Sequence, residues 1–353
     1  MLGKLFLDIA FQFARIAYIG IVINANKAEI TTEIYQNRKL IKREKREFES
    51  PNGNPSQLMV DYLQRTEKHN TYAYTATALS SINQGAIPGA DPNFFKAMSI
   101  EVDKIVTLSN SDRWTVYGSI YDVEDIQKRF STLEGIDYIF PTECVIDYLR
   151  DKMSLALMNS ESEVYLLYDK TSVTLVIYNG DILTYSSHFK FDDEVEDMIE
   201  SNDLGDIFGE PMNVNDINSE VVELDNISDD FNTIEDLNTF IASDDPSNMG
   251  KPEMPELSAP EEAPQFDLDK EVLETNIKRD MLLFNFIKNS LNAFYKNDHF
   301  KSGFVSNAYI FDTHGAAKGI GKFFKEELCV ESQIIDIDLS ESICALAVAE
   351  AAL

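Results

Sequence analysis

The sequence predicts an α/β protein whose folded body is interrupted by one long acidic segment. Apolar residues make up 44% of the 353 residues, which is enough for a sizeable core. Stretches with strand-like and helix-like spacing of apolar residues follow one another in both halves of the chain. The formal charge of −31 is concentrated between residues 192 and 274, which hold 27 Asp and Glu residues against two lysines. The remaining residues carry a net charge of only −6, which is ordinary for a soluble domain.

The first half of the chain predicts a three-stranded meander, then a helix, a fourth strand and a small subdomain. Gly and Pro residues between 83 and 93 indicate a turn-rich crossing into that subdomain. The elements before this crossing are expected over residues 16–23, 27–35, 38–49, 56–69 and 71–78. Those after it are strands over 100–108 and 114–121, a helix over 123–133, a short strand over 138–140 and a helix from 141.

The second half predicts a strand hairpin, a long helix and a strand–helix–strand–helix ending. Asn179-Gly180 between two β-rich runs favours a tight hairpin turn, because both residues tolerate positive φ. The expected elements are strands over 164–168, 173–178 and 182–189, a helix over 268–297, a strand over 305–311, a helix over 315–328, a strand over 332–336 and a helix over 340–352.

An apolar stretch at the N-terminus predicts an amphipathic helix over about residues 2–14. The residues that recur at helical spacing are Leu2, Phe6, Ile9 and Phe13. The uncharged stretch that follows, residues 16–25, is too short for the roughly 20 residues that a bilayer requires. The helix either packs on its own domain or contacts a membrane surface or a neighbouring subunit.

The acidic segment is expected to be largely disordered, because low hydrophobicity and high charge bury too little apolar area to offset the ordering entropy. Two islands within it carry spaced apolar residues. One lies at 195–199, and the other consists of Ile234, Leu237, Phe240 and Ile241. Such islands present anchors to a partner's groove, for which a basic protein is the candidate, or they cover the body of their own chain.

Composition and motifs exclude several classes of function. Net acidity disfavours nucleic-acid binding, which requires cations for the phosphates. A basic run at residues 38–46 is the solvated side of a strand, or it contacts anionic lipid, an acidic partner or the acidic segment itself. Three widely spaced cysteines and four scattered histidines form neither a disulfide framework nor a metal motif. Because the Cys and His residues form no metal motif, we expect no metal site. Because no nucleophile or acid–base motif appears, we expect no enzyme activity.

Three short stretches, in order, resemble the nucleotide-binding motifs of actin-like proteins of the PilM and FtsA type. They are Ile-Gly-Ile-Val-Ile-Asn-Ala-Asn-Lys at 19–27, Leu-Leu-Tyr-Asp-Lys-Thr-Ser-Val-Thr-Leu at 166–175 and Ile-Phe-Asp-Thr-His-Gly-Ala-Ala-Lys-Gly-Ile at 310–320. The order of elements is also similar. The resemblance implies a two-lobed actin-like, ribonuclease H-like α/β fold with an inserted small α+β subdomain and a long acidic insertion.

The same resemblance implies where a nucleotide would lie and why this site is degenerate. The matching positions are Asn24, Lys27, Asp169, Gly315 and Gly319. Val22 replaces an acid of the first motif, Asn24 replaces a glycine, and Lys170 or Thr171 stands where a glycine is expected. The acidic segment takes the place of a subdomain that helps to hold the base. We therefore expect no ATP hydrolysis, weak or absent ATP binding, and no cofactor.

The resemblance also implies a domain division and a role. The expected parts are an N-terminal helix (1–15), a first lobe (16–90 and 141–160), an inserted subdomain (91–140), a second lobe (161–191 and 268–353) and the acidic insertion (192–267). The implied role is a cytoplasmic, oligomeric scaffold, peripheral at the inner membrane, that holds the N-terminal peptide of a PilN-like bitopic membrane protein in a groove within 72–140. Type IV pili, type II secretion systems and flagellar motors are candidate machines. The alternative is an actin-family ATP-binding protein or ATPase with a divergent site.

Overall fold

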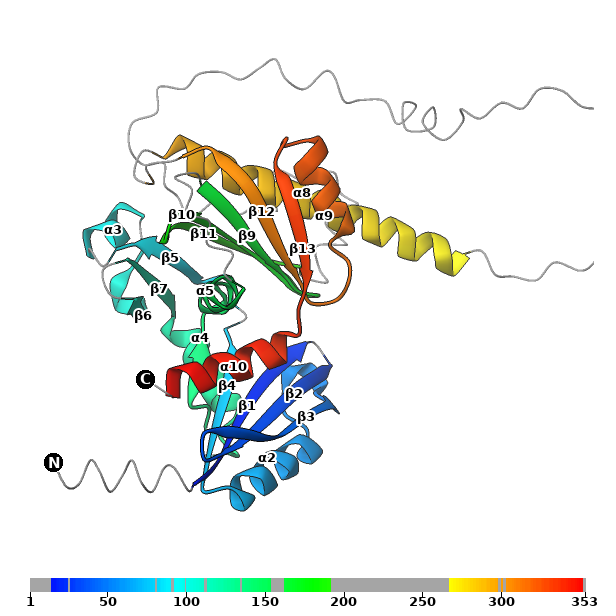
Figure 1. Ribbon diagram of the computed structural model, residues 1–353. Coiled ribbons are helices and arrows are strands. Elements are labelled where there is room, and N and C mark those ends of the chain that lie inside the picture. Colours follow the sequence, from blue (N-terminus) through cyan, green and yellow to red (C-terminus); the bar gives the residue numbers. More distant parts are fainter. Residues whose placement is uncertain are drawn as a thin grey trace, which may run out of the picture.

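The computed structural model describes residues 14–24, 26–79, 81–89, 92–98, 100–110, 113–133, 135–153, 162–191, 267–297, 300 and 303–351 (Figure 1). Two groups of expected contact residues lie outside this part of the chain. They are the N-terminal set Leu2, Phe6, Ile9 and Phe13, and the acidic-segment set Ile234, Leu237, Phe240 and Ile241.

The first lobe is built on a five-stranded sheet with the order β3-β2-β1-β4-β8. Strands β1, β2 and β3 form an antiparallel meander, whereas β4 and β8 run parallel to β1. The strands are β1 (Arg15–Asn24), β2 (Lys27–Gln36), β3 (Lys39–Glu49), β4 (Tyr72–Ala78) and β8 (Tyr138–Phe140). A 3-10 turn, η1 (Pro51–Gly53), and helix α2 (Gln57–His69) connect β3 to β4.

The second lobe repeats this arrangement with the order β11-β10-β9-β12-β13. Its first three strands are again antiparallel, and β12 and β13 again run parallel to the central strand. The strands are β9 (Ser162–Tyr168), β10 (Ser172–Asn179), β11 (Ile182–Lys190), β12 (Val305–Asp312) and β13 (Glu331–Asp336). This duplicated strand order defines the two-lobed, ribonuclease H-like architecture of actin, so the expected fold class is confirmed.

The sheet of the second lobe is covered on both faces, as its continuous apolar strands require. Val164 and Leu166 of β9 face a cluster that includes helices α8 (Asp267–Lys296) and α9 (Lys318–Glu326). The alternating residues Tyr165 and Leu167 face the opposite cluster, which contains residues of α5 (Thr142–Lys152). In the first lobe, α2 covers one face of the sheet through Met59, Tyr62 and Leu63.

Two helices cross between the lobes. Helix α5 follows the first sheet but contacts β9 and β10 of the second. Helix α10 (Leu339–Ala351) follows the second sheet but contacts β1, β2 and β4 of the first, as Figure 1 shows for the red helix. The two helices also contact each other, so the crossing ties the lobes through one shared apolar cluster.

The inserted subdomain differs in its boundaries from the expected range 91–140. Its sheet has the order β5-β7-β6, formed by β5 (Gln84–Pro88), β6 (Ile105–Asn110) and β7 (Trp114–Ser119). Helix α3 (Pro92–Ala97), the 3-10 turn η2 (Val102–Lys104) and helix α4 (Ile120–Arg129) complete it. The strand β5 lies where glycine and proline suggested only a turn, because burial of Ala86 and Ile87 outweighs those signals. The strand β8, expected in the insertion, belongs to the first sheet.

Gly20 allows α10 to lie directly on β1. A Cβ atom at this position would stand 2.2 Å from the Ser340 carbonyl oxygen and 2.6 Å from the Cys344 backbone nitrogen. The Cys344 thiol donates to the Tyr18 carbonyl oxygen at 3.3 Å, on the same contact surface. Any side chain at residue 20 must therefore move the crossing helix off the sheet.

We expect Gly20→Ala to lower the free energy of unfolding by about 1–3 kcal/mol, because the added methyl group overpacks a backbone contact. Gly180→Asn is the matched control: Gly180 has a φ of 61° and open space around its Cβ position, and Asn tolerates this conformation. Chemical denaturation of both variants measures the difference. Equal stability of the two variants would show that the close approach of α10 to β1 is not required.

Candidate functional site

A polar cavity of about 110 Å³ lies between the lobes. There the β1–β2 turn of the first lobe and the β9–β10 turn of the second lobe face the start of α10. This volume is below the range of about 300–1,000 Å³ that is typical of small-molecule pockets. Two residues expected at a nucleotide site, Asn24 and Asp169, line it. The other lining residues are Val22, Glu29, Lys45, Lys170, Thr313, Ile337, Asp338, Leu339 and Ser340.

The Asp169 carboxylate joins three turns from different parts of the chain. It is only 8% exposed, at the end of β9. Thr313, in the β12–α9 turn, donates its hydroxyl to Oδ1 at 2.7 Å. Asn24 of the first lobe, with its amide nitrogen facing Asp169, donates to Oδ2 at 3.2 Å. The three predicted nucleotide motifs do converge, but their side chains bind one another.

Asp312 occupies the anion position of the turn between β12 and α9. Its Oδ1 atom accepts hydrogen bonds from the backbone nitrogens of His314 at 3.0 Å and Gly315 at 2.9 Å. Its Oδ2 atom accepts one from the nitrogen of Ala317 at 2.7 Å. Backbone N–H groups before a helix are the donors that bind a phosphate in many nucleotide sites. Here a buried carboxylate of the same chain already satisfies three of them.

The structure explains why residue 315, in this turn, and residue 319, in the helix that follows, are both glycine. Gly315 has a φ of 77°, a conformation that side chains rarely adopt. Gly319 lies within α9, and a Cβ atom there would stand 3.2 Å from the Asp280 carboxylate on α8. Gly315 thus shapes the turn, whereas Gly319 permits close packing of two helices.

Arg279 of α8 holds the second predicted motif, the β9–β10 turn. Its Nη2 atom donates to the carbonyl oxygens of Asp169 at 3.1 Å and Lys170 at 2.6 Å. The guanidinium also lies 4.5 Å from the centroid of the Phe191 ring, a favourable cation–π distance. The turn is therefore fastened to a helix that follows the acidic segment in sequence.

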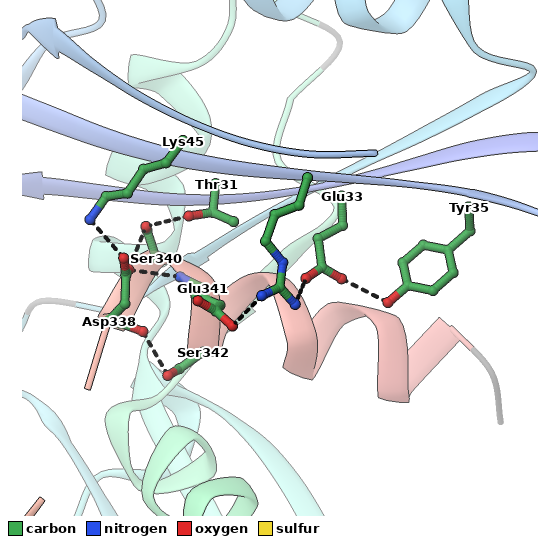
Figure 2. Close-up of polar contacts among 9 residues, drawn as sticks. Thr31, Glu33, Tyr35, Lys45, Asp338, Ser340, Glu341 and Ser342 are labelled. Carbon is green, nitrogen blue, oxygen red and sulfur yellow. Dashed lines mark hydrogen bonds and ion pairs between the residues drawn. The ribbon is translucent and has the colours of Figure 1, made fainter. Parts of the chain in front are cut away.

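Lys45 of β3 lines the first-lobe side of the cavity, and its ammonium group is paired with carboxylates; Figure 2 shows its contact with Asp338. Its Nζ atom lies 2.7 Å from Asp338 Oδ2 and 2.9 Å from Glu29 Oε2. Burial opposes the charged form of Lys45, but the hydrogen bonds to Asp338 and Glu29 outweigh this effect and raise its pKa. Because its charge is matched by two carboxylates, Lys45 is not free to bind an anionic ligand.

Asp338 also caps α10. Its Oδ1 atom accepts hydrogen bonds from the Ser340 hydroxyl at 2.8 Å and the Glu341 backbone nitrogen at 3.0 Å (Figure 2). Burial favours the neutral acid, but the hydrogen bonds from Lys45, Glu341 and Ser340 prevail and lower the pKa of Asp338. One carboxylate thus begins the crossing helix and binds it to the edge strand of the first lobe.

The same contact continues along β2. The Arg43 guanidinium lies 2.6 Å from Glu33 and 2.8 Å from Glu341, and the Tyr35 hydroxyl donates to Glu33 at 2.7 Å. The hydroxyl groups of Thr31 and Ser340 lie 2.7 Å apart (Figure 2). The first turns of α10 are therefore held by a continuous polar network along β2 and β3.

A second polar cluster lies outside the cavity, where β5, α5, β10 and β11 meet. The Thr142 hydroxyl lies 2.8 Å from that of Thr174, which lies 2.7 Å from His188 Nδ1. Burial lowers the pKa of His188 to about 4 and raises the pKa of Glu143 to about 7. Gln84 of the inserted subdomain accepts from the Thr142 backbone nitrogen at 3.0 Å, so the cluster joins that subdomain to the second lobe.

Of the five predicted site residues, the structure brings Asn24 and Asp169 into the cavity and Gly315 into the adjoining turn. Lys27 is exposed and does not line the cavity, and Gly319 packs against α8. Sequence reasoning missed Lys45, Asp338 and the hydrogen bonds of Asp312 to the backbone of its own turn. One available signal was Asp338 three residues before Glu341 at the start of an apolar helix, which is a capping pattern.

In the part of the chain that the structure describes, no cluster of three His, Cys, Asp or Glu side chains is arranged to hold a metal. None of the described helices is long and apolar enough to cross a membrane. Cys144 and Cys344 are buried free thiols, and Cys329 is an exposed one. In the lining of the cavity, Lys45 pairs with Asp338 and Asn24 binds Asp169, and both contacts join the two lobes.

Two substitutions separate the roles of Asp338. Asn remains a good helix cap, so Asp338→Asn removes mainly the ion pair with Lys45 and should cost about 0.5–1 kcal/mol, since both side chains are partly exposed. Asp338→Ala removes the cap as well and should cost about 1–2 kcal/mol. Urea denaturation measures both differences.

The pH dependence of the same variants gives an independent check. Because the folded state lowers the pKa of Asp338, its contribution is present above the unfolded Asp pKa of about 3.9 and is lost as the pH falls through the folded pKa. The stability difference between the wild type and Asp338→Asn should therefore shrink on acidification. A difference that stays constant from neutral pH to pH ~2 would contradict the ion-pair account.

Two family models match the chain. Residues 14–144 match the model described as Domain of unknown function (DUF8569), and residues 164–352 match the model described as Domain of unknown function (DUF8341). A search among curated proteins finds no match.

Solved structures with a similar arrangement share little sequence identity with the chain. The PilM–PilN type IV pilus biogenesis complex is 12% identical, with 92% of this chain and 89% of that chain covered and a TM-score of 0.42. The ethanolamine utilization protein EutJ from Carboxydothermus hydrogenoformans is 9% identical over 94% and 89% of the two chains, with a TM-score of 0.38. Acetate kinase from Entamoeba histolytica is 9% identical over 94% and 98%, with a TM-score of 0.38.

The second family model begins within β9 and extends past the end of the crossing helix α10, a span of slightly more than half of the chain. The chain therefore belongs to the family described as Domain of unknown function (DUF8341).

Proposed function

We propose that this protein is a non-catalytic scaffold that holds an apolar peptide of a membrane-anchored partner between its first lobe and its inserted subdomain. The observation that carries the proposal is an apolar groove of about 100 Å³ at this junction. Its lining residues are Leu79, Val106, Thr107, Leu108, Val116, Gly118, Val123, Ile139 and Pro141.

The groove has the features of a peptide site. Val106 and Leu108 of β6 are 46% and 52% exposed, although they adjoin the buried residues Leu79 and Val116. The strand β6 is the outer strand of its sheet, and in the described residues its second edge pairs with no strand. An extended peptide can add to such an edge through main-chain hydrogen bonds while its alternate side chains enter the apolar groove.

The motifs that resemble PilM suggest the class of partner. We propose the N-terminal cytoplasmic peptide of a PilN-like bitopic membrane protein, which would place the scaffold on the cytoplasmic face of the inner membrane as an oligomeric ring or platform. All of the residues that line the groove except Pro141 fall in the range 72–140 that the resemblance implies for this peptide. A type IV pilus, a type II secretion system and a flagellar motor are the candidate machines.

The interlobe cavity supports a role without catalysis. Asp312 takes the backbone donors of the third motif, Asp169 binds Asn24 and Thr313, and Lys45 is paired with two carboxylates. A nucleotide phosphate would have to displace these contacts and would meet the negative charge of Asp169 and Asp312. The alternative, an actin-family ATPase with a divergent site, is favoured only by the convergence of the three motifs on one cavity.

If the groove binds the peptide, a negative charge introduced into the groove should weaken the binding of the peptide. Val106→Glu and Leu108→Glu should each weaken binding of a fluorescent peptide from the cytoplasmic N-terminus of a PilN-like protein by at least about tenfold, because a buried carboxylate lacks a partner. Fluorescence anisotropy with the full chain measures the affinity.

Ile182→Glu serves as the control for that measurement, since Ile182 is 45% exposed on β11 and lies outside the groove. Its affinity for the peptide should equal that of the wild type. A wild-type protein that binds no such peptide, or groove variants that bind as tightly as the control, would refute the proposed site.

A further inference from the structure

Several exposed cationic side chains lie at one end of the first lobe. The β2–β3 turn consists of Asn37 and Arg38, with φ values of 54° and 59°, and Lys39 begins β3. Arg15, the first residue of β1, lies opposite Gln36 at the end of β2. Arg15, Arg38 and Lys39 are all exposed, and the strand register brings them to the same end of the sheet.

Two adjacent aliphatic residues are exposed at the same end. Leu40 and Ile41 are 43% and 49% exposed. Leu40 lies opposite Tyr35 and Lys42 lies opposite Ile34, so a bulge leaves Ile41 without a partner residue on β2. The turn therefore presents an apolar tip beside its cations. We call Arg38, Lys39, Leu40 and Ile41 the hairpin tip.

The charges of β3 change along its length. Farther from the turn, Arg43 and Lys45 are bound to carboxylates of β2 and α10. At the turn, by contrast, none of the described carboxylates forms an ion pair with Arg15, Arg38 or Lys39. Helix α2 ends near Arg15 and adds Glu67, Lys68 and His69, which are also exposed. Among the described residues, the basic charge of the hairpin tip is therefore not neutralised by a carboxylate.

The chain enters the lobe at this same end. Thirteen residues precede Ala14, and Lys4 and Asp8 are the two charged side chains among them. This near-neutral, apolar sequence joins the lobe directly before Arg15. Its attachment point therefore lies beside the exposed aliphatic and cationic residues of the hairpin tip.

We infer that the hairpin tip, together with Arg15, is a contact surface for a bilayer with anionic phospholipid headgroups. Exposed aliphatic side chains flanked by Arg and Lys match the boundary between acyl chains and headgroups, where each cation gains from the negative surface potential. An acidic protein surface would use the cations but would leave Leu40 and Ile41 without a function. Apolar insertion and basic charge together supply the two weak signals that reversible membrane binding requires.

This surface is separate from the proposed peptide groove. The hairpin tip lies at the end of the sheet where β1 and β4 begin, whereas Leu79 of the groove follows the last residue of β4. A lipid surface and a peptide can therefore bind at the same time. Failure of peptide binding would leave the lipid inference standing, and failure of lipid binding would leave the peptide site standing.

Vesicle flotation of the full chain tests the inference. Vesicles of phosphatidylcholine alone are compared with vesicles that contain about 30% phosphatidylglycerol, at salt concentrations of about 0.05 M and 0.5 M. The wild type should float with the anionic vesicles at low salt, and the bound fraction should fall sharply at high salt. Arg38→Glu with Lys39→Glu should weaken partitioning at least about tenfold. Leu40→Ser with Ile41→Ser should also weaken it.

Lys322→Glu with Lys325→Glu on α9 is the control, because both lysines are exposed and the change in net charge is the same. This control should float like the wild type, and thermal unfolding checks that every variant is folded. Absence of wild-type binding to anionic vesicles would overturn the inference and would leave an acidic protein as the ligand of these cations. Unchanged binding of the hairpin-tip variants would also overturn it and would assign the binding to residues 2–13.

Discussion

The contact between α10 and β1 is the constraint on which the two-lobed arrangement depends. The helix starts from the second lobe and lies on the first because Gly20 leaves room for its backbone. Asp338 fixes this arrangement by capping the helix and binding Lys45 of the edge strand. Helix α5 crosses in the opposite direction, so each lobe supplies one helix that packs on the other. The cavity between the lobes is shaped by this exchange.

Around the interlobe cavity, polar side chains of the chain bind one another and the backbone. A phosphate-binding turn needs backbone donors and low negative charge, and Asp312 supplies an internal anion for those donors. Asp169 likewise finds its donors in Asn24 and Thr313. The contacts of Asp312 and Thr313 lie within the second lobe, whereas the contact of Asn24 with Asp169 joins the two lobes. The apolar groove and the exposed hairpin tip, by contrast, lie on the outer faces of the first lobe and the insertion.

Local patterns predicted most of the elements, because apolar spacing and turn residues act within a few positions. Asn179-Gly180 identified its hairpin, and Gly180 does have a positive φ. The strand β5 was not predicted, because its glycine and proline residues are typical of a turn. The burial that makes this segment a strand arises only against β7 and β11, so a local pattern does not reveal it. The pairing of Lys45 with Asp338 joins residues 293 positions apart, so no local pattern could reveal it. The capping pattern at Asp338, a signal that the prediction did not use, indicates where the helix starts but not which lobe it contacts.

In the interlobe cavity, side chains of the chain itself fill the place that the resemblance to actin-like proteins assigns to a nucleotide. Isothermal titration calorimetry of the full chain with Mg-ATP tests this claim most directly, because binding would require the Asp169 and Lys45 contacts to break. We expect no saturable heat up to about 1 mM ATP, which corresponds to a binding free energy weaker than about −4 kcal/mol. A submicromolar dissociation constant would contradict it and would favour the divergent ATPase.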